Sequence, residues 1–133
     1  MFTSKIKIYF FDCDPAGIIF FASLFKYSHL VYEDFMNSLK TERDYFKDNE
    51  YLLPIINAEA TYIKPIKVAD ELTVNMSVTQ LKDSSFELTY SFYKDNAILA
   101  KAKTVHVCVN KEKFEKTSIP EELNKHLIFH KNL

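Results

Sequence analysis

One long stretch with helical periodicity lies among segments that alternate like strands, and this contrast restricts the fold more than any other feature. Between about residues 22 and 39, apolar side chains recur every three or four positions, as at Leu24, Val31, Phe35 and Leu39. That spacing predicts an amphipathic helix of about five turns with a wide apolar face. A second, short helix is expected over residues 41–47, and a helical turn over residues 120–126.

Several segments alternate between apolar and polar side chains, as strands with one buried face do. They cover residues 5–13, 52–62, 72–79, 86–92 and 98–109. Short polar breaks of hairpin length separate the last three, which favours antiparallel pairing. A sheet with one buried face needs a cover, and the long helix is the element available for it. The sequence therefore predicts an α+β fold, with a curved antiparallel sheet of about five strands wrapped around one long helix.

The size and charge of the chain narrow the functional classes. With 133 residues, of which 47% are hydrophobic, the chain is long enough to form a single domain, residues 1–133, with its own core. Its 17 basic and 18 acidic residues nearly cancel, so no net field attracts nucleic acid or a membrane surface. No apolar run approaches the roughly 18 residues of a membrane span. Cys13 and Cys108 are expected to be reduced core thiols of a cytoplasmic protein.

The sole glycine, Gly17, ends the tetrapeptide Asp14-Pro15-Ala16-Gly17 just before the predicted helix. Glycine is used where the backbone takes a positive φ or approaches a partner closely. A carboxylate in a rigid turn before a helix is a candidate reactive centre, because the helix N-terminus carries partial positive charge. The alternative is a structural turn that the Asp14 side chain caps.

The residues around this turn resemble those of a known family. Residues 11–20, Phe-Asp-Cys-Asp-Pro-Ala-Gly-Ile-Ile-Phe, lie between a predicted strand and the long helix. This arrangement closely resembles the hotdog-fold acyl-CoA thioesterases of the 4-hydroxybenzoyl-CoA thioesterase type. Residues 53–58, Leu-Pro-Ile-Ile-Asn-Ala, and 104–109, Thr-Val-His-Val-Cys-Val, look most like the 1,4-dihydroxy-2-naphthoyl-CoA hydrolases of that superfamily. The resemblance implies a hotdog fold and hydrolysis of an acyl-CoA thioester.

The resemblance also implies which groups are catalytic. Asp14 occupies the place of the family's catalytic carboxylate, in the turn that Gly17 closes. The backbone amide of Phe21 occupies the place of the amide that donates a hydrogen bond to the thioester oxygen in the family. A carboxylate either attacks the thioester carbonyl and forms an anhydride or acts as a base toward water, and the sequence leaves both routes open. Asp12 is expected to be structural, and Glu33, on the helix, is a second candidate carboxylate.

Substrate contacts are expected from aromatic and phosphate-binding residues. Aromatic walls suit a flat aromatic acyl group, whereas phosphates suit lysine and backbone or hydroxyl donors. Candidates for the acyl pocket, with core or interface packing as the alternative, are Phe20, Phe21, Phe25 and Tyr62. Candidates for the coenzyme A end, partly by resemblance, are Lys64, the hairpin residues Lys82, Ser84 and Ser85, and Lys101.

The remaining polar residues indicate no metal chemistry. His29 and His106 are expected to be core or interface residues, and His126 and His130 to be solvated. No Cys and His spacing is typical of a zinc site. The resemblance implies no cofactor, since coenzyme A is part of the substrate. It implies a homotetramer built as a dimer of dimers, with active sites at the interface between subunits.

The expected function is thus an acyl-CoA thioesterase for an aromatic acyl group, of the 1,4-dihydroxy-2-naphthoyl-CoA or hydroxybenzoyl-CoA type. The first of these substrates would place the enzyme in menaquinone or phylloquinone biosynthesis. Two alternatives stay open at this point. One is a broad thioesterase for short- or medium-chain acyl-CoA or acyl-carrier-protein substrates, and the other is a non-catalytic hotdog subunit that binds acyl groups.

Overall fold

The structure, a computed structural model, describes residues 1–131. The strands are β1 (Phe2–Lys7), β2 (Tyr51–Leu52), β3 (Ile55–Tyr62), β4 (Glu71–Leu81), β5 (Ser85–Lys94), β6 (Ala97–Val107) and β7 (Val109–Asn110). The helices are the 3-10 helix η1 (Phe10–Asp12) and the α-helices α1 (Ser23–Ser38) and α2 (Glu121–Phe129).

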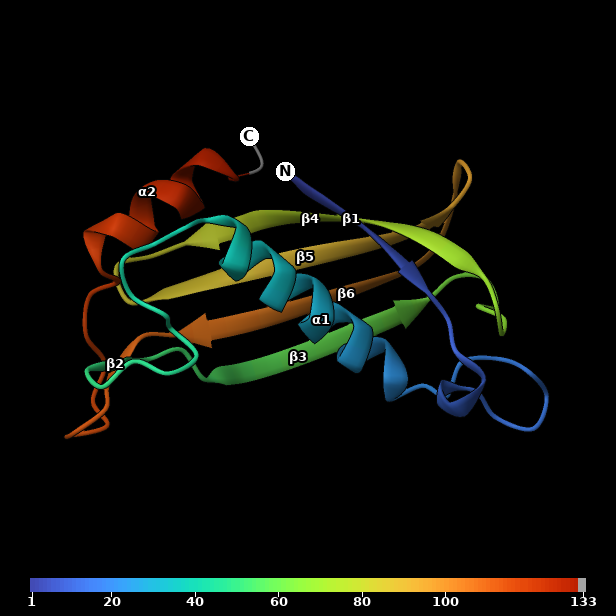
Figure 1. Cartoon of the computed structure of the whole chain (residues 1–133), viewed down its shortest axis with the longest axis horizontal. Coiled ribbons are helices and arrows are strands. Elements are labelled where there is room, and N and C mark those ends of the chain that lie inside the picture. Colours follow the sequence, from blue (N-terminus) through green and yellow to red (C-terminus); the bar gives the residue numbers. More distant parts are fainter. Residues whose placement is uncertain (132–133) are drawn as a thin grey trace.

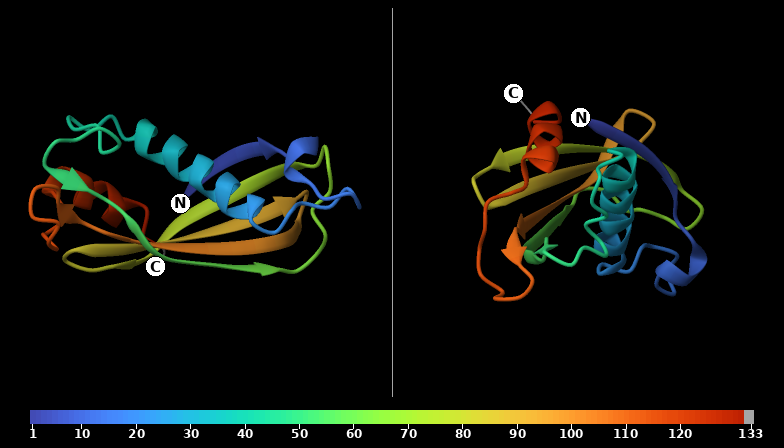
Figure 2. Two further views of the ribbon diagram at one scale, coloured as in Figure 1. Left: turned by 90° about the horizontal axis from the view of Figure 1, so that it is seen from below. Right: turned by 60° about the vertical axis from the view of Figure 1, so that its left-hand side comes forward.

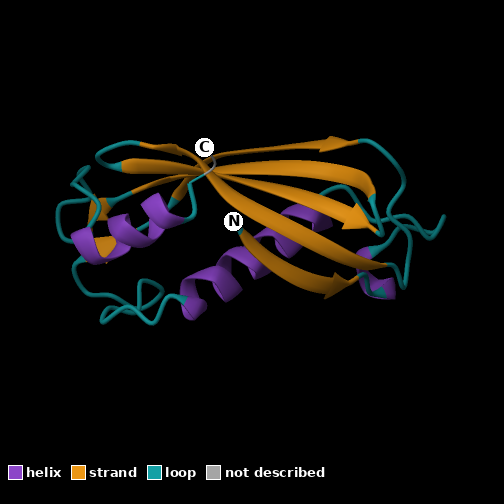
Figure 3. Ribbon diagram, turned by 90° about the horizontal axis from the view of Figure 1, so that it is seen from above, coloured by secondary structure: helices purple, strands orange, loops and turns teal. Residues whose placement is uncertain are grey.

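Five strands form one antiparallel sheet in the order β1-β4-β5-β6-β3, while β2 and β7 pair separately. The long helix α1 crosses the sheet obliquely (Figure 1). Both α-helices lie on the same face of the sheet, which curves over α1 (Figure 3). The expected α+β arrangement, a curved sheet around one long helix, is confirmed.

The core lies between α1 and the concave face of the sheet. The helix contributes Leu24, Val31 and Phe35, which are fully buried because the 3.6-residue period places them on one side. The central strands contribute alternate residues, and their buried side chains include Val74, Met76, Leu88, Tyr90 and Phe92. Each buried side chain of this size stabilises the fold by about 1.5–3 kcal/mol. No helix of the described part of the chain covers the convex face (Figure 2).

The first strand ends earlier than predicted. The alternation of residues 5–13 suggested one continuous strand, but β1 ends at Lys7 and η1 follows. Pairing ends there because β4, the neighbour of β1, begins only at Glu71. Ile8 makes the last contacts, donating to the Asp70 carbonyl oxygen and accepting from the Ala69 amide at 2.9 and 2.8 Å. Phe10, which an uninterrupted strand over residues 5–13 would place on the same face as the buried Ile8, is 80% exposed.

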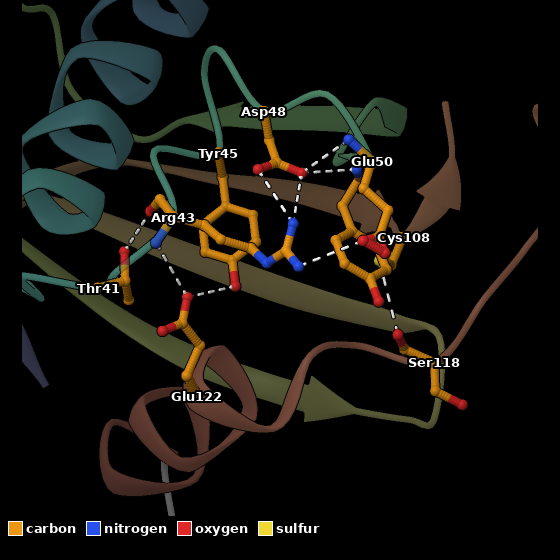
Figure 4. Close-up of polar contacts among 9 residues, drawn as sticks. Thr41, Arg43, Tyr45, Asp48, Glu50, Cys108, Ser118 and Glu122 are labelled. Atoms are coloured by element: carbon orange, nitrogen blue, oxygen red, sulfur yellow. Dashed lines mark hydrogen bonds and ion pairs between the residues drawn. The ribbon is translucent and has the colours of Figure 1, made fainter. Parts of the chain in front are cut away.

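The helix predicted over residues 41–47 is absent from the structure, which has a loop there. Local side-chain bonds replace the helical ladder, as polar residues in turns often do. The Thr41 hydroxyl donates to the Arg43 carbonyl, and the Phe46 amide donates to Asp44. Glu122 of α2 then accepts bonds from the Arg43 amide and the Tyr45 hydroxyl (Figure 4). The predicted turn near residues 120–126 is confirmed and extends to form α2.

Candidate active site

The Asp14-Pro15-Ala16-Gly17 segment forms a tight turn. The Asp14 amide donates to the Ile18 carbonyl oxygen at 2.8 Å, and the Gly17 amide donates to the Asp14 carbonyl oxygen at 2.9 Å. Gly17 has a φ of 76°, in the left-handed region that glycine adopts at little cost. A β-carbon at Gly17 would lie 3.9 Å from Val68 Cγ1, so backbone conformation rather than space calls for glycine here.

Main-chain hydrogen bonds hold this turn between η1 and the segment that leads into β4. The Phe20 amide donates to the Asp12 carbonyl oxygen at 2.9 Å. On the other side, the Ile19 amide donates to the Ile66 carbonyl oxygen at 2.8 Å. The Val68 amide donates to the Gly17 carbonyl oxygen at 2.9 Å. The turn therefore sits rigidly at the end of the sheet where α1 begins (Figure 1).

The two carboxylate oxygens of Asp14 differ in their surroundings. Oδ1 accepts hydrogen bonds from the Ala16 amide at 2.9 Å and the Ile18 amide at 3.3 Å. Within residues 1–131, no hydrogen bond reaches Oδ2. Asp14 thus caps its own turn through one oxygen, as the structural interpretation expected, and the same two bonds orient a second oxygen that remains available for chemistry.

The start of α1 offers unpaired amide donors beside this turn. Its N-cap residue, Ala22, makes no side-chain capping bond, and the first turn of α1 contains no acidic residue. Among the described residues, the amides of Phe21 and Ala22 have no acceptor. The first amides of a helix carry the positive end of its dipole and attract negative charge. This end of α1 can therefore stabilise an oxyanion.

An apolar groove of about 310 Å³ adjoins the helix start. Three candidate residues, Phe21, Tyr62 and Lys64, line it. The Tyr62 hydroxyl also donates to the Phe21 carbonyl oxygen. Burial raises the pKa of Tyr62, so its phenol is a protonated donor in the neutral range. The groove combines apolar and aromatic walls with one lysine, a composition that suits an organic ligand.

Sequence reasoning missed the aliphatic walls of this groove, which are Ile18, Ile19, Ile63, Pro65 and Ile66. They come from two segments about 45 residues apart, which the main-chain bonds of the turn bring together. Two expected pocket residues lie outside the lining. Phe20 packs beside Phe21, with ring centroids 4.9 Å apart, and Phe25 is half-buried on the first turn of α1.

Asp12 has the structural role expected for it. It is only 7% exposed, and its carboxylate accepts hydrogen bonds from Lys26 Nζ at 3.0 and 3.2 Å and from the Tyr27 hydroxyl at 2.8 Å. The Tyr27 hydroxyl in turn accepts from the Tyr9 amide. Burial raises the pKa of Tyr27 to about 12. The cluster fastens η1 to α1 and occupies the Asp12 oxygens.

The hairpin residues Lys82, Ser84 and Ser85 lie at the far end of β4 from the Asp14 turn (Figure 1). Eleven residues of β4, at about 3.3 Å each, separate the two ends. Asp83, inside this hairpin, accepts bonds from the Ser118 hydroxyl at 2.9 and 3.0 Å. These candidates therefore do not meet Asp14 within one chain. Lys101 is exposed on β6.

The histidines lie in different surroundings. His106 is fully buried, as expected, with its ring stacked on Phe86 and its Nε2 2.9 Å from the Thr104 hydroxyl. Burial lowers the pKa of His106 to about 4. His130, expected to be solvated, instead packs edge-on against Phe35. His29, expected in the core or an interface, is exposed within this chain.

Other candidate groups show no organised site. Glu33 is exposed on α1. Among residues 1–131, no group of three or more His, Cys, Asp and Glu residues could hold a metal ion. Cys13 and Cys108 are free thiols; Cys108 is buried as predicted, whereas Cys13 is partly exposed and lies outside the strands. No helix in the described part of the chain is both long and apolar enough to cross a membrane.

Sequence comparisons find similar proteins over most of the chain. Residues 9–127 match the family model described as the thioesterase-like superfamily. A 1,4-dihydroxy-2-naphthoyl-CoA hydrolase from Rippkaea orientalis is 34% identical over 116 residues, which cover 84% of each chain. An enzyme of the same name from Microcystis aeruginosa is 35% identical, over 87% of this chain and 85% of its own.

Solved structures show the same likeness. A 1,4-dihydroxy-2-naphthoyl-CoA thioesterase from Synechocystis superposes with a TM-score of 0.88 and 25% identity, covering 96% of this chain and 95% of its own. A gentisyl-coenzyme A thioesterase gives a TM-score of 0.83 and 26% identity, covering 94% of this chain and 98% of its own.

Proposed function

The chain belongs to the thioesterase-like superfamily, and we propose that it hydrolyses the thioester of an aromatic acyl-coenzyme A, with 1,4-dihydroxy-2-naphthoyl-CoA as the preferred substrate. The products are the free aromatic acid and coenzyme A. Two relatives named for this substrate are 34% and 35% identical over most of the chain, and another similar protein is named for gentisyl-coenzyme A, whose acyl group is also aromatic.

One observation supports the catalytic assignment above all. Asp14 has one oxygen anchored by two amides and another without a hydrogen bond from the described residues, beside a helix start with unpaired amides. In the proposed reaction, Oδ2 attacks the thioester carbonyl carbon or takes a proton from the attacking water. The Phe21 amide stabilises the negative charge that develops on the carbonyl oxygen. The C–S bond then breaks, and the thiolate leaves and takes up a proton. On the route through Asp14 as nucleophile, water then hydrolyses the anhydride, which releases the free acid and restores the Asp14 carboxylate. On the route through water, the free acid forms directly and Asp14 gives up the proton that it took.

The groove lined by Phe21 and Tyr62 is the proposed acyl site. Its aromatic and aliphatic walls exclude water from a flat ring, and it begins at the amides that face the thioester oxygen. Lys64 at its margin offers a positive charge to a ring substituent or a phosphate of coenzyme A. A short aliphatic acyl group such as butyryl is smaller than a naphthoyl ring and would fill such a groove less completely, which underlies the substrate order that we propose.

The test is thiol release from three thioesters, the dihydroxynaphthoyl, hydroxybenzoyl and butyryl esters of coenzyme A. Asp14→Asn is the catalytic variant, and Glu33→Gln is a matched loss of one carboxylate on the exposed face of α1. We expect turnover of the aromatic esters, fastest for dihydroxynaphthoyl-CoA, to be lost in Asp14→Asn and kept in Glu33→Gln. Equal turnover of all three esters would contradict the aromatic preference, and binding without turnover would favour the non-catalytic alternative.

We also propose that the working enzyme is a homotetramer, a dimer of dimers, in which strands β3 of two chains lie edge to edge. Within the described residues the outer edge of β3 is unpaired, and Ile56 on it is 60% exposed. An unpaired apolar edge strand invites pairing with another chain. Assembly would also let Lys82, Ser84 and Ser85 reach a coenzyme A held by another subunit. Light scattering of wild type and Ile56→Glu tests this proposal, since the variant should be smaller.

The proposed reaction uses only Asp14, backbone amides and water, so we propose that it needs no cofactor. The two free thiols suit the reducing environment of the cytoplasm, which is the location that we propose. Dialysis against a chelator is the corresponding check, and activity should be unchanged after it.

A further inference from the structure

The start of α1 is held by a side chain from a distant strand. Helix starts are usually capped by a Ser, Thr, Asp or Asn side chain, but Ala22 makes no such bond. Within residues 1–131, the one side-chain hydrogen bond to residues 20–23 comes from Tyr62, whose hydroxyl donates to the Phe21 carbonyl oxygen. The two residues are 41 positions apart in the sequence.

Tyr62 is well placed to hold this peptide still. It is the last residue of β3 and pairs with Ala100 of β6. Just beyond it, the amides of Ile63 and Lys64 both donate to the Leu99 carbonyl oxygen, at 2.9 and 3.0 Å. The sheet therefore fixes the backbone of Tyr62, and its side chain spans from this anchor to the turn before α1.

The bond that Tyr62 makes acts on the peptide unit between Phe21 and Ala22. In a trans peptide the C=O and N–H groups point in opposite directions, so holding the Phe21 carbonyl fixes the direction of the Ala22 amide. A hydrogen bond to a carbonyl also polarises the peptide and strengthens its N–H as a donor. Both amides at this point lack acceptors within the described chain.

We propose that Tyr62 is a positioning residue, whose hydroxyl fixes and polarises the Phe21–Ala22 peptide so that the Ala22 amide joins the Phe21 amide at the thioester oxygen in the transition state. This role goes beyond that of a wall of the groove, and it rests on the proposed thioesterase function. A wall residue needs only its ring, which Tyr62→Phe retains. A positioning residue needs the hydroxyl, so that substitution separates the two roles.

The experiment compares wild type, Tyr62→Phe and Tyr93→Phe with 1,4-dihydroxy-2-naphthoyl-CoA. Tyr93 lies on β5, and its hydroxyl makes no hydrogen bond with the described residues, so Tyr93→Phe is a matched control. We expect Tyr62→Phe to lower kcat about 3- to 10-fold, the range for one lost hydrogen bond, and to change KM less than about twofold. Tyr93→Phe should match wild type in both rate and melting temperature, whereas the one hydrogen bond lost in Tyr62→Phe should lower the melting temperature by only a few degrees.

A spectroscopic readout tests the oxyanion contact directly. The same thioester is bound to Asp14→Asn, which should bind without turnover, and its carbonyl stretching frequency is measured by infrared difference spectroscopy. Hydrogen bonds to the carbonyl lower that frequency. We expect the carbonyl frequency of the bound thioester, compared with that of the free thioester, to decrease less in the double variant Asp14→Asn/Tyr62→Phe than in Asp14→Asn.

The possible outcomes keep the two proposals apart. Wild-type turnover with an unchanged kcat in Tyr62→Phe, or equal carbonyl frequencies in the Asp14→Asn protein and the double variant, would overturn the role of Tyr62 and leave the thioesterase assignment in place. Absence of wild-type turnover with every thioester would overturn the proposed function, and the role of Tyr62 with it.

Discussion

Asp12 and Asp14 are two residues apart, yet their carboxylates have opposite surroundings. Asp12 is buried, and Lys26 and Tyr27 occupy both of its oxygens. Asp14 is partly exposed, and backbone amides hold only one of its oxygens. One aspartate fastens η1 to α1, whereas the other presents an oxygen at the end of the sheet.

The difference shows how a carboxylate is kept for structure or for chemistry. A carboxylate whose charge is neutralised and whose two oxygens are both hydrogen-bonded has little reactivity. Its hydrogen bonds stabilise the fold instead. Anchoring through backbone amides fixes direction while leaving one oxygen unoccupied, which a nucleophile or base requires. Sequence position alone does not separate the two roles, because both residues precede the same proline.

The largest effect should come from Asp14→Asn. The amide oxygen of the substituted side chain can still accept the two bonds that shape the turn, but a carboxamide is neither a base nor a nucleophile. We expect kcat to fall about 10²- to 10⁴-fold while the free energy of unfolding changes by less than about 0.5 kcal/mol. Urea titration and thiol-release kinetics on the same preparation check both values. A large loss of stability in Asp14→Asn would make Asp14 a structural residue like Asp12.

Asp12→Asn should show the reverse pattern. It weakens the bonds to Lys26 and Tyr27, so we expect a loss of about 1–3 kcal/mol in the free energy of unfolding. This loss of stability is smaller than that from breaking a fully buried ion pair, because the Lys26 side chain is 59% exposed and water solvates its ammonium group in the variant. The folded variant should keep kcat within about threefold of wild type, measured well below its melting temperature. A selective loss of kcat at full stability would contradict the division of roles.

Gly17→Ala tests the backbone that presents Asp14. At a φ of 76°, an alanine costs about 1–2 kcal/mol, although its β-carbon meets no close neighbour. We expect a stability loss of that size, measured by urea titration, together with a lower kcat because the turn shifts.

The matched control is Ala69, which follows Val68, the residue whose amide donates to the Gly17 carbonyl oxygen. Ala69 also has a positive φ, 69°, without being glycine. Ala69→Gly should therefore raise stability slightly, by about 0.5 kcal/mol after the entropy cost of glycine. Equal destabilisation by both substitutions would show that side-chain packing rather than φ governs this region.

The smallest loss expected from removing a structural feature concerns Asp70, a paired carboxylate of the Asp12 type. Burial opposes its ionisation, but hydrogen bonds from Lys94 and the Lys67 amide outweigh it, so the pKa of Asp70 lies below its ordinary value of 3.8. Its contribution to stability is complete above the ordinary value and is lost as the pH falls through the lower, folded-state pKa. Asp70→Asn should cost about 1 kcal/mol near pH 7.

The control for this prediction is the pH dependence of the difference in unfolding free energy between wild type and Asp70→Asn. Urea titrations of wild type and Asp70→Asn should differ by a constant amount between pH 5 and pH 7, since Asp70 is ionised throughout that range. The two proteins should converge as the pH falls below about 3.8. A difference that persists at pH 2 would mean that the bonds of Asp70 do not depend on its charge.

Periodicity predicted the parts of the fold that form one continuous core. The stripe with Leu24, Val31 and Phe35 identified α1, and strict alternation identified β4, β5 and most of β6. The strand predicted over residues 5–13 was too long, because the alternation of side chains does not show where the neighbouring strand begins. The prediction of a helix at residues 41–47 was wrong because the Thr41 and Asp44 side chains bond to the backbone within that loop, and Glu122, about 80 positions later, accepts two of its amides.

The candidate site was predictable to the extent that its parts are local in sequence. The turn at Asp14 and Gly17 was identified from a few adjacent residues, and the structure has a tight turn there with a positive φ at the glycine. The partners of Asp12, Lys26 and Tyr27, and the bond from Tyr62 to Phe21 join segments that only the folded sheet brings together. No periodic or spacing signal marks such contacts in one sequence.

The turn that carries Asp14 is joined to its neighbours through main-chain hydrogen bonds, at Asp12, Gly17, Ile19 and Val68. Such bonds do not depend on which side chains the joined residues carry. Positions such as Ile18 and Ile63, which line the groove, can therefore exchange side chains during evolution while the reactive geometry persists. A scaffold of this kind lets substrate preference diverge rapidly, and a small library at these two positions should yield active enzymes with altered acyl preference.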